Sequence, residues 1–275
     1  MPVISTNTAA NAALNYLNIN SANETESISQ LASGSRIVQA KDDAAGLAIG
    51  TQLDANVTVF QEDEVNVAQG TSILQSTDGA LAQISNVLAR MLSLATESAS
   101  GQVTGTQRVQ DINTEYQQLR GEISSVVSST TYAGNSLLTG SFLSNVKFLI
   151  GTQSTNFISV SLKTVSAAGL LGTAGATVST AATALKAIAG VNSAINTITK
   201  DRALVGAYES QFNFSGQDIA TNVQNISSAA SVIMDADVAQ VKSSLSAQDV
   251  KTQASIAALT QASQLPQELL HLLQS

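Results

Sequence analysis

The chain has 275 residues and a net charge of −8, with hydrophobic residues making up 44% of it and aromatic residues only 4%. The acidic balance excludes the basic patch that nucleic-acid binding requires. The chain contains no cysteine, which excludes disulfides, thiolate metal sites and a cysteine nucleophile. It also lacks an apolar run of about 18 residues and a basic, apolar leader, so we expect neither membrane insertion nor a cleaved Sec signal peptide.

The absence of cysteine and the near absence of histidine remove the side chains on which most catalytic and metal sites depend. His271 is the only histidine, and we interpret it as a polar position on a C-terminal helix. A Ser-His-Asp triad, a histidine zinc site and the glycine-rich phosphate loops have no matching pattern. The acidic runs Asp42–Asp43 and Glu62–Asp63–Glu64 are interpreted as solvated helix surface. We therefore predict a protein that is not an enzyme and that uses no cofactor or metal.

The first element predicted in chain order is a helix with a sparse apolar face. Apolar residues recur at helical spacing, but Ser21 and Glu24 stand where apolar residues are expected. A helix that buries so little apolar surface gains little stability by itself and needs a partner. The apolar face is formed by Leu14, Leu17, Ile28 and Leu31.

The longest predicted helix carries a strict seven-residue apolar repeat, which is the seam of a left-handed supercoil. A second helix over 109–126 has apolar residues three and four positions apart. Because a Ser/Gly turn over 98–105 joins the two helices, we expect them to pack antiparallel. The repeat consists of Leu53, Phe60, Val67, Leu74, Leu81, Leu88 and Ala95.

The middle of the chain loses the helical spacing. Residues 130–140 contain two glycines and an asparagine and predict a loop. Residues 146–151 and 156–162 are β-branched and aromatic with a short polar linker between them, so they predict a β-hairpin. The small residues of 166–176 predict a further loop.

Helical spacing returns near residue 180 and continues to the end of the sequence. The last stretch resembles the first in its polar gaps and low charge, so both ends require a partner surface, either each other or other subunits. The pattern predicts a mainly α fold of long helices, with a small β-hairpin region near the middle. The last apolar face contains Val241, Leu245, Ile256, Leu259 and Leu269.

Five segments, taken together and in this order, resemble those of bacterial flagellins. The resemblance covers about 1–165 and 181–275, and it leaves only a short stretch where family members usually carry variable outer domains. The segments are QLASGSRIVQAKDDAAGLAIG (30–50), TTYAGNSLLTG (130–140), FLIGTQSTNFISVSL (148–162), SAASVIMDADVAQ (228–240) and LTQASQLPQELLHLL (259–273).

The resemblance implies a structural subunit that self-assembles into the flagellar filament for swimming motility. It implies unfolded export through the flagellar type III channel, and hence a secreted, extracellular location. The implied partners are other copies of the chain, an export chaperone, the filament cap protein and the hook–filament junction proteins.

The resemblance also implies a long-helix bundle or coiled coil formed by both chain ends, so that the chain folds as paired halves. Residues 1–43 and 236–275 correspond to the two halves of an inner coiled-coil domain. Residues 44–142 and 181–235 correspond to the two halves of a helical bundle domain. Residues 143–180 then hold the hairpin and a short loop in place of the variable outer region.

Flagellins of several groups are recognised by an innate immune Toll-like receptor. The positions that match the recognised residues are Arg90, Leu94 and Glu115. Their neighbours Leu92 and Ser93 are uncharged, whereas strongly recognised members carry charges there. Ordinary bundle surface is the competing interpretation of Arg90 and Glu115.

Three other interpretations of the sequence stay open at this point. A hook–filament junction protein shares flagellin-like ends. A flagellin-like cell-surface protein acting as an adhesin or polysaccharide binder would use the same scaffold, although the chain has no tryptophan and only four tyrosines for stacking on sugars. A signalling coiled coil is disfavoured by the predicted hairpin.

Overall fold

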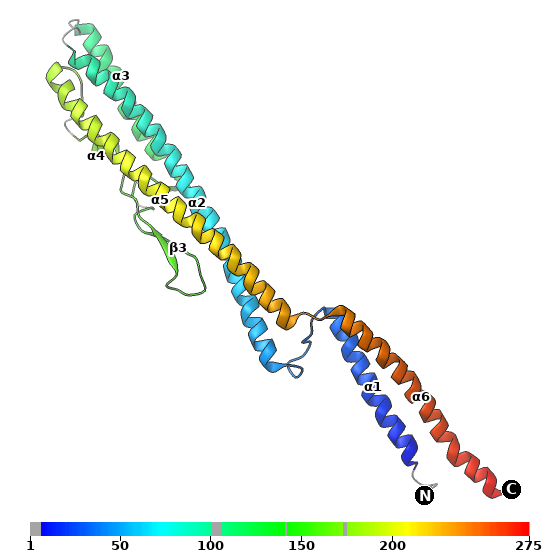
Figure 1. Ribbon diagram of the computed structural model, residues 1–275. Helices are drawn as coiled ribbons and strands as arrows, with labels where there is room; N and C mark the ends of the chain where they lie inside the picture. The colour runs from blue at the N-terminus through cyan, green and yellow to red at the C-terminus, as the bar shows by residue number, and fades with distance from the viewer. Residues whose placement is uncertain (1–6, 101–105, 141, 173–174, 275) are drawn as a thin grey trace. The chain divides into compact units, whose positions relative to one another are not determined.

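The computed structural model describes residues 7–100, 106–140, 142–172 and 175–274 (Figure 1). Long helices dominate these residues, which confirms the mainly α fold class. The helices are α1 (Thr8–Ser33), α2 (Ala44–Ala99), α3 (Thr106–Ser129), α4 (Ala167–Leu171), α5 (Ala181–Met234) and α6 (Val238–Gln274). The strands are β1 (Thr131–Tyr132), β2 (Asn135–Ser136), β3 (Val146–Leu149) and β4 (Phe157–Val160).

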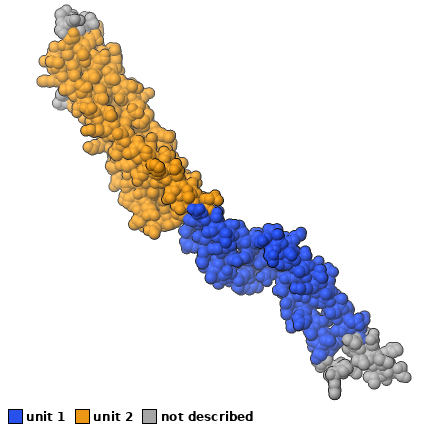
Figure 2. All heavy atoms as spheres, viewed as in Figure 1, with its two compact units in different colours: residues 1–56, 225–275 blue, residues 57–224 orange. Residues whose placement is uncertain are grey.

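The chain forms two compact units, which Figure 2 distinguishes by colour. Unit 1 contains residues 1–56 and 225–275, so it is built from the two ends of the sequence. Unit 2 contains residues 57–224. Helices α2 and α5 each contribute residues to both units.

The seven-residue repeat of α2 is the buried face of that helix in unit 2. Leu74, Leu81, Leu88 and Ala95 are each at most 1% exposed, as the repeat predicts. Towards the start of α2 the burial weakens, and Phe60 is only partly buried. The facing stripe on α5 has the same helical spacing and is fully buried at Val191, Ala194, Ile198, Val205, Phe212 and Ile219.

The second predicted helix is confirmed as α3, which buries Ile112, Tyr116 and Ile123 in the same core. The hydroxyl of Tyr116 donates to the carbonyl oxygen of Gly175 at 2.9 Å. Burial of this hydroxyl raises the pKa of Tyr116 to about 12. The tyrosine thereby fixes the segment before α5 against α3. Much of the predicted turn ahead of α3 falls on residues 101–105, outside the described part of the chain.

The predicted β-hairpin is confirmed, with β3 and β4 pairing antiparallel and Leu149 opposite Phe157. Phe148 on β3 meets the ring of Phe212 edge-on, with 5.1 Å between the ring centroids. Phe212 also lies directly over Gly70 of α2, where an added Cβ would come within 2.4 Å of the ring. Gly70 therefore admits the aromatic ring that joins the hairpin to the helices.

Two segments predicted as loops contain regular structure. Residues 130–140 include the two-residue strands β1 and β2, which are joined by a turn with positive φ at Ala133 and Gly134. Residues 166–176 include α4, because Ser166 caps that helix by accepting from the backbone N–H of Gly169. Both corrections have the same cause: neither segment has a periodic pattern, so turn geometry and capping decide its structure.

The prediction of a solvated acidic surface is wrong for Asp63, which is 1% exposed. Asp63 lies one turn before Val67 on α2, so it continues the buried stripe towards Phe60. Burial raises the pKa of Asp63, and a hydrogen bond from the Asn66 side chain partly opposes this rise. The other carboxylate oxygen, Oδ2, has no hydrogen-bond partner within the described residues.

In unit 1, α1 and α6 run antiparallel and lie side by side (Figure 1). Few of the large side chains in this pair are deeply buried. Among the residues of the two helices whose side chains the structure describes, Ser27 and Ala262 are the buried ones. The pair therefore has no apolar core comparable with that of unit 2.

Candidate assembly interface

Two main-chain hydrogen bonds, which we call the backbone clip, join the segment after α1 to the segment between α5 and α6. The N–H of Arg36 donates to the carbonyl oxygen of Met234 at 2.7 Å, and the N–H of Ala236 donates to that of Gly34 at 2.9 Å. Gly34 ends α1 with a positive φ of 70°, which glycine adopts without strain. Two segments about 200 residues apart in the sequence are thus held together by main-chain bonds.

The acidic pair Asp42–Asp43 builds the loop between α1 and α2, so its interpretation as solvated helix surface is wrong. Asp42 Oδ2 accepts from the backbone N–H of Val38 and of Gln39, at 3.2 and 2.8 Å. Asp43 Oδ1 accepts from the N–H of Gly46 at 2.7 Å and so caps the start of α2. Short polar side chains that capture free backbone N–H groups explain why two adjacent aspartates stand here.

Arg36 connects this loop to the end of α5. Its Nη2 donates to the carbonyl oxygen of Ile233 at 2.8 Å and lies 3.7 Å from the carboxylate of Asp43. The hydroxyl of Ser35 donates to the carbonyl oxygen of Met234 at 3.0 Å. These bonds, with the backbone clip, define what we call the junction: residues 34–46 and 233–236.

Two glycines, one within the junction and one next to it, let neighbouring side chains lie directly against the backbone of α2. A Cβ on Gly46 would lie 2.4 Å from Asp43 Oδ2 and 2.9 Å from the buried side chain of Ile37. A Cβ on Gly50 would lie 2.3 Å from the sulfur of Met234. Substitution at either position therefore requires these neighbouring side chains to move.

Beyond the junction, α1 and α6 contact each other through polar side chains. Asn20 Nδ2 donates to Ser255 Oγ at 3.0 Å, and Thr252 Oγ1 donates to Glu24 Oε2 at 3.0 Å. These residues were not predicted as part of the interface. The signal was present in the sequence, because Asn20 and Glu24 continue the helical spacing of Leu17.

The predicted apolar faces divide into two groups. Leu14, Ile28 and Ile256 are about half exposed, at 47, 50 and 49%. For Leu269, the side chain lies outside the described part of the structure. The remaining predicted residues are partly buried along the helix pair: Leu17, Leu31, Val241, Leu245 and Leu259.

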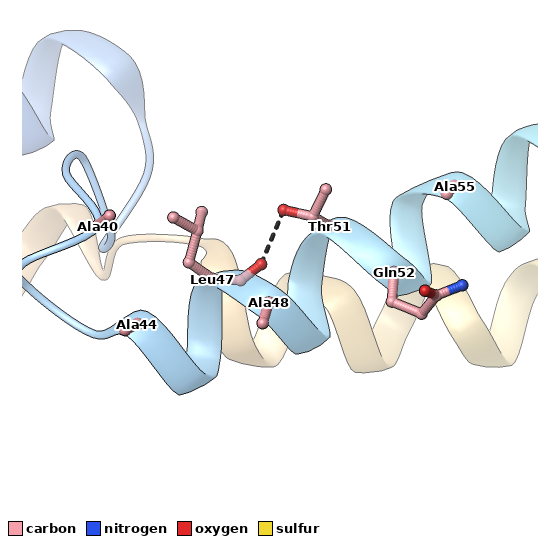
Figure 3. Close-up of a pocket in the computed structure, with 7 residues that line it drawn as sticks. All are labelled: Ala40, Ala44, Leu47, Ala48, Thr51, Gln52 and Ala55. Carbon is pink, nitrogen blue, oxygen red and sulfur yellow. Dashed lines mark hydrogen bonds between the residues drawn. The ribbon is translucent and has the colours of Figure 1, made fainter.

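The start of α2 carries a shallow apolar groove of about 420 Å³ in unit 1 (Figure 3). Four alanines shape it, and Leu47 supplies the largest apolar side chain. The hydroxyl of Thr51 turns back to the carbonyl oxygen of Leu47 at 2.7 Å. The groove is lined by Ala40, Ala44, Leu47, Ala48, Thr51, Gln52 and Ala55.

The three residues that match a receptor contact lie together in unit 2. Arg90 donates through Nε and Nη2 to Oε1 of Glu115, at 2.8 and 2.6 Å. Both side chains are exposed, at 54 and 43%. Leu94 is only 2% exposed and belongs to the hydrophobic core of unit 2. A partner that binds this part of unit 2 can therefore reach Arg90 and Glu115 but not Leu94.

Two further findings bear on chemistry. Among the described residues, no group of three or more histidine, cysteine or acidic side chains is placed to hold a metal ion. None of the helices in the described ranges combines the length and the apolar character needed to cross a membrane.

Three features of this fold are typical of structural proteins that form polymers. The helices are long and antiparallel, the chain ends pair through a weakly apolar contact, and leucine and isoleucine side chains of this pair are half exposed. Two family models make the assignment specific. The bacterial flagellin N-terminal helical region matches residues 4–142, and the bacterial flagellin C-terminal helical region matches residues 188–273. The chain belongs to the bacterial flagellin family, and it is a subunit of the flagellar filament.

Relatives of similar length support this membership. The flagellar filament 30.7 kDa core protein of Treponema maltophilum is 32% identical, with 98% of this chain and 99% of the relative aligned. The flagellin of Listeria monocytogenes is 31% identical, with 99% of each chain aligned. The flagellin of Bacillus subtilis is 31% identical over 98% of this chain and 99% of the relative.

Solved structures agree with the fold. The crystal structure of Bacillus cereus flagellin matches with a TM-score of 0.51 and 26% identity, covering 60% of this chain and 94% of that one. A flagellar hook-associated protein from Vibrio parahaemolyticus matches with a TM-score of 0.58 over 70% of this chain and 99% of that one. At 12% identity, the second match shows a shared fold alone.

Proposed function

We propose that unit 1 is the main polymerisation surface of this filament subunit. The observation that carries the proposal is the exposure of Leu14, Ile28 and Ile256 on a helix pair that has almost no core of its own. Exposed apolar side chains of this size gain free energy when a neighbouring subunit covers them. The occupant is a second copy of the chain, because the family forms a homopolymer.

The groove at the start of α2 fits the same role. Its alanine lining lets a helix of a neighbouring copy approach closely, and Ile49 beside it is 53% exposed. Helices that present small residues can pack at short interaxial distance. Unit 1 would then contact neighbours through both the α1–α6 pair and α2.

The inner coiled-coil domain of residues 1–43 and 236–275 and the bundle domain of residues 44–142 and 181–235 are part of this proposal. Residues 143–180 take the place of a variable outer region. The compact units divide the chain elsewhere, at residues 56 and 224. We propose that assembly, and not compactness of the single chain, defines the 43 and 235 boundaries.

We further propose a purely structural role without catalysis. The chain would leave the cell unfolded through the type III channel and act outside the cell. An export chaperone, the cap protein and the junction proteins would be its transient partners. The absence of cysteine supports this route, since no disulfide can form before the chain is outside. Recognition of Arg90 and Glu115 by a Toll-like receptor belongs to the same set of proposals, whereas the third matching residue, Leu94, is 2% exposed.

The polymerisation surface is tested by making it polar. The triple variant Leu14→Gln, Ile28→Gln, Ile256→Gln removes apolar contact from both helices, and we expect it to lose seeded filament growth, followed by light scattering and electron microscopy. The matched control Leu14→Met, Ile28→Leu, Ile256→Leu keeps the apolar character and should polymerise. Filament growth at the native rate by the glutamine variant would overturn the proposal.

A further inference from the structure

The contact between α1 and α6 becomes polar in its middle. On α1 the residues that face the partner helix are Leu17, Asn20, Glu24, Ser27 and Leu31, and none of them is exposed. They follow the three-and-four spacing of a coiled-coil seam. Leucines therefore flank a block of three polar residues.

Helix α6 carries a matching block. Its inward residues are Leu245, Gln248, Thr252, Ser255 and Leu259, again at three-and-four spacing and again not exposed. The two polar blocks lie at the same level of the antiparallel pair. Polar residues on a helix usually face solvent. Here polar residues of both helices occupy facing positions, which indicates that they interact with each other.

The two blocks form hydrogen bonds with each other at two positions. Asn20 donates to Ser255 and Thr252 donates to Glu24, each at 3.0 Å. In the next layer, Ser27 and Gln248 line a polar cavity of about 280 Å³ between the helices. Gln248 Oε1 is buried there without a hydrogen-bond partner among the described residues.

A shift in register would break this match. Residues seven positions apart occupy the same face of a helix. A seven-residue slip of α6 past α1 in either direction would place Glu24 opposite Leu245 or Leu259 and not opposite Thr252. Neither leucine offers a donor, and a partly buried carboxylate without a donor is unfavourable. The same slip would place Thr252 opposite Leu17 or Leu31, so its hydroxyl would lose the Glu24 acceptor as well.

We propose that the pairs Glu24–Thr252 and Asn20–Ser255 determine the register of the α1–α6 pair. The junction holds one end of the two helices, and the polar block fixes their alignment along the rest of their length. The effect of the register on filament assembly rests on the proposed polymerisation surface. A seven-residue slip shifts the helices by about 10 Å, so Leu14 and Ile28 would no longer be aligned with Ile256 for a neighbouring copy.

The register can be measured with engineered cysteines, because the native chain has none. Leu17 lies seven residues before Glu24, and Leu259 lies seven residues after Thr252, so the pair Leu17→Cys with Leu259→Cys reports the native register. The pair Ala10→Cys with Leu259→Cys reports a seven-residue slip. Both reporters leave the polar block intact. Disulfide formation is quantified in full-length chains, as seeded filaments and as monomers, on non-reducing gels.

The polar block is then altered in each reporter background. The double variant Glu24→Leu with Thr252→Leu removes the discriminating pair and adds apolar surface. Its matched control, Thr25→Leu with Gln253→Leu, places the same two leucines one position further along each helix, where both side chains are exposed. The conservative variant Glu24→Gln keeps an oxygen that accepts from Thr252.

In the native chain we expect the native-register disulfide to dominate. In the double variant we expect the slip disulfide to rise roughly tenfold relative to the native chain, while Glu24→Gln and the exposed control stay at the native ratio. An unchanged ratio in the double variant would overturn the proposal and assign the register to the junction alone. The proposed polymerisation surface is judged separately, by filament growth of the triple glutamine variant and its matched control, so failure of one proposal is distinguishable from failure of the other.

Discussion

Arg202 of α5 and Asp78 of α2 form a two-pronged ion pair within unit 2. Nε of the arginine donates to Oδ1 of the aspartate at 2.8 Å, and Nη2 donates to Oδ2 at 3.0 Å. In the sequence, Arg202 stands among the apolar positions of α5, and Asp78 is a polar gap in α2. Each residue occupies the edge of a buried face, where the other supplies its charge partner.

This ion pair predicts an acid-dependent loss of stability. The hydrogen bond from Arg202 lowers the pKa of Asp78 below its ordinary value of 3.8. The contribution of the pair is therefore present above pH 3.8 and is lost as the pH falls through the lowered pKa. Because both side chains are more than one-third exposed, we expect Asp78→Asn to lower the free energy of unfolding at pH 7 by only about 1 kcal/mol.

Urea unfolding at pH 7 and at a pH below the lowered pKa tests this prediction. The difference between the native chain and Asp78→Asn should disappear at the lower pH. Glu122→Gln, at an exposed position of α3, serves as the control and should differ little from the native chain at either pH. A constant difference at both pH values would show that the pair does not act through its charge.

The buried Asp63 predicts the opposite dependence on pH. Burial raises its pKa in the folded chain, so its ionisation costs folding free energy that grows as the pH rises above 3.8 and levels off above the raised pKa. Asp63→Asn removes the charge and keeps the shape. We expect it to raise the free energy of unfolding at pH 8 by about 1–3 kcal/mol, with no gain at acidic pH. Thermal unfolding at both pH values provides the measurement, with Glu62→Gln as the exposed control. If Asp63→Asn were less stable than the native chain at pH 8, the prediction would be wrong.

The buried seam of α2 predicts that removing one leucine side chain from it lowers the stability of the fold substantially. Leu81 is 1% exposed in the core of unit 2, so Leu81→Ala should lower the free energy of unfolding by about 2–5 kcal/mol. Gln83→Ala, an exposed change two residues further on the same helix, should have little effect. Circular dichroism melts of the monomers provide the measurement. An unchanged melting temperature for Leu81→Ala would mean that the repeat is not the buried seam.

The close approach at Gly50 predicts that alanine weakens the junction. A Cβ there would collide with the side chain of Met234, whose carbonyl oxygen accepts from both Arg36 and Ser35. We expect Gly50→Ala to cost about 1–3 kcal/mol, seen as lower helicity and faster cleavage of residues 34–46 by protease. The control Gly79→Ala meets no atom within 4 Å and should stabilise α2 by about 1 kcal/mol. Equal effects of the two substitutions would remove the structural role assigned to Gly50.

The thin contact between α1 and α6 predicts that the chain ends depend on assembly. In the monomer, each helix has only the other to cover its half-exposed leucine and isoleucine side chains. We expect protease to trim residues 1–43 and 236–275 from the monomer and to leave a fragment near 44–235, while filaments resist. Mass spectrometry of timed digests identifies the fragments. Ends that resist protease equally in monomer and filament would show that the pair is stable without neighbours.

Periodicity in the sequence was sufficient to predict the long helices, but not the short helix α4. The seven-residue repeat around Leu81 and the three-and-four spacing of α3 are local signals, because every turn of a helix repeats the same pattern on one face. The β-branched and aromatic residues on either side of a short polar linker likewise predicted the hairpin that begins at Val146. The low apolar content of the two ends also predicted that they need a partner.

The tertiary structure decided which polar residues belong to an interface. Asp63 looks like a surface carboxylate in the sequence, and Glu24 looks like a polar gap in an apolar face, but Asp63 is buried and Glu24 accepts a hydrogen bond from Thr252 of α6. The same holds for Asp78 and Arg202, which lie 124 residues apart. A pattern along one helix shows which face is turned inward, but the chemistry of a contact depends on two helices, and only the folded chain brings the second one into place.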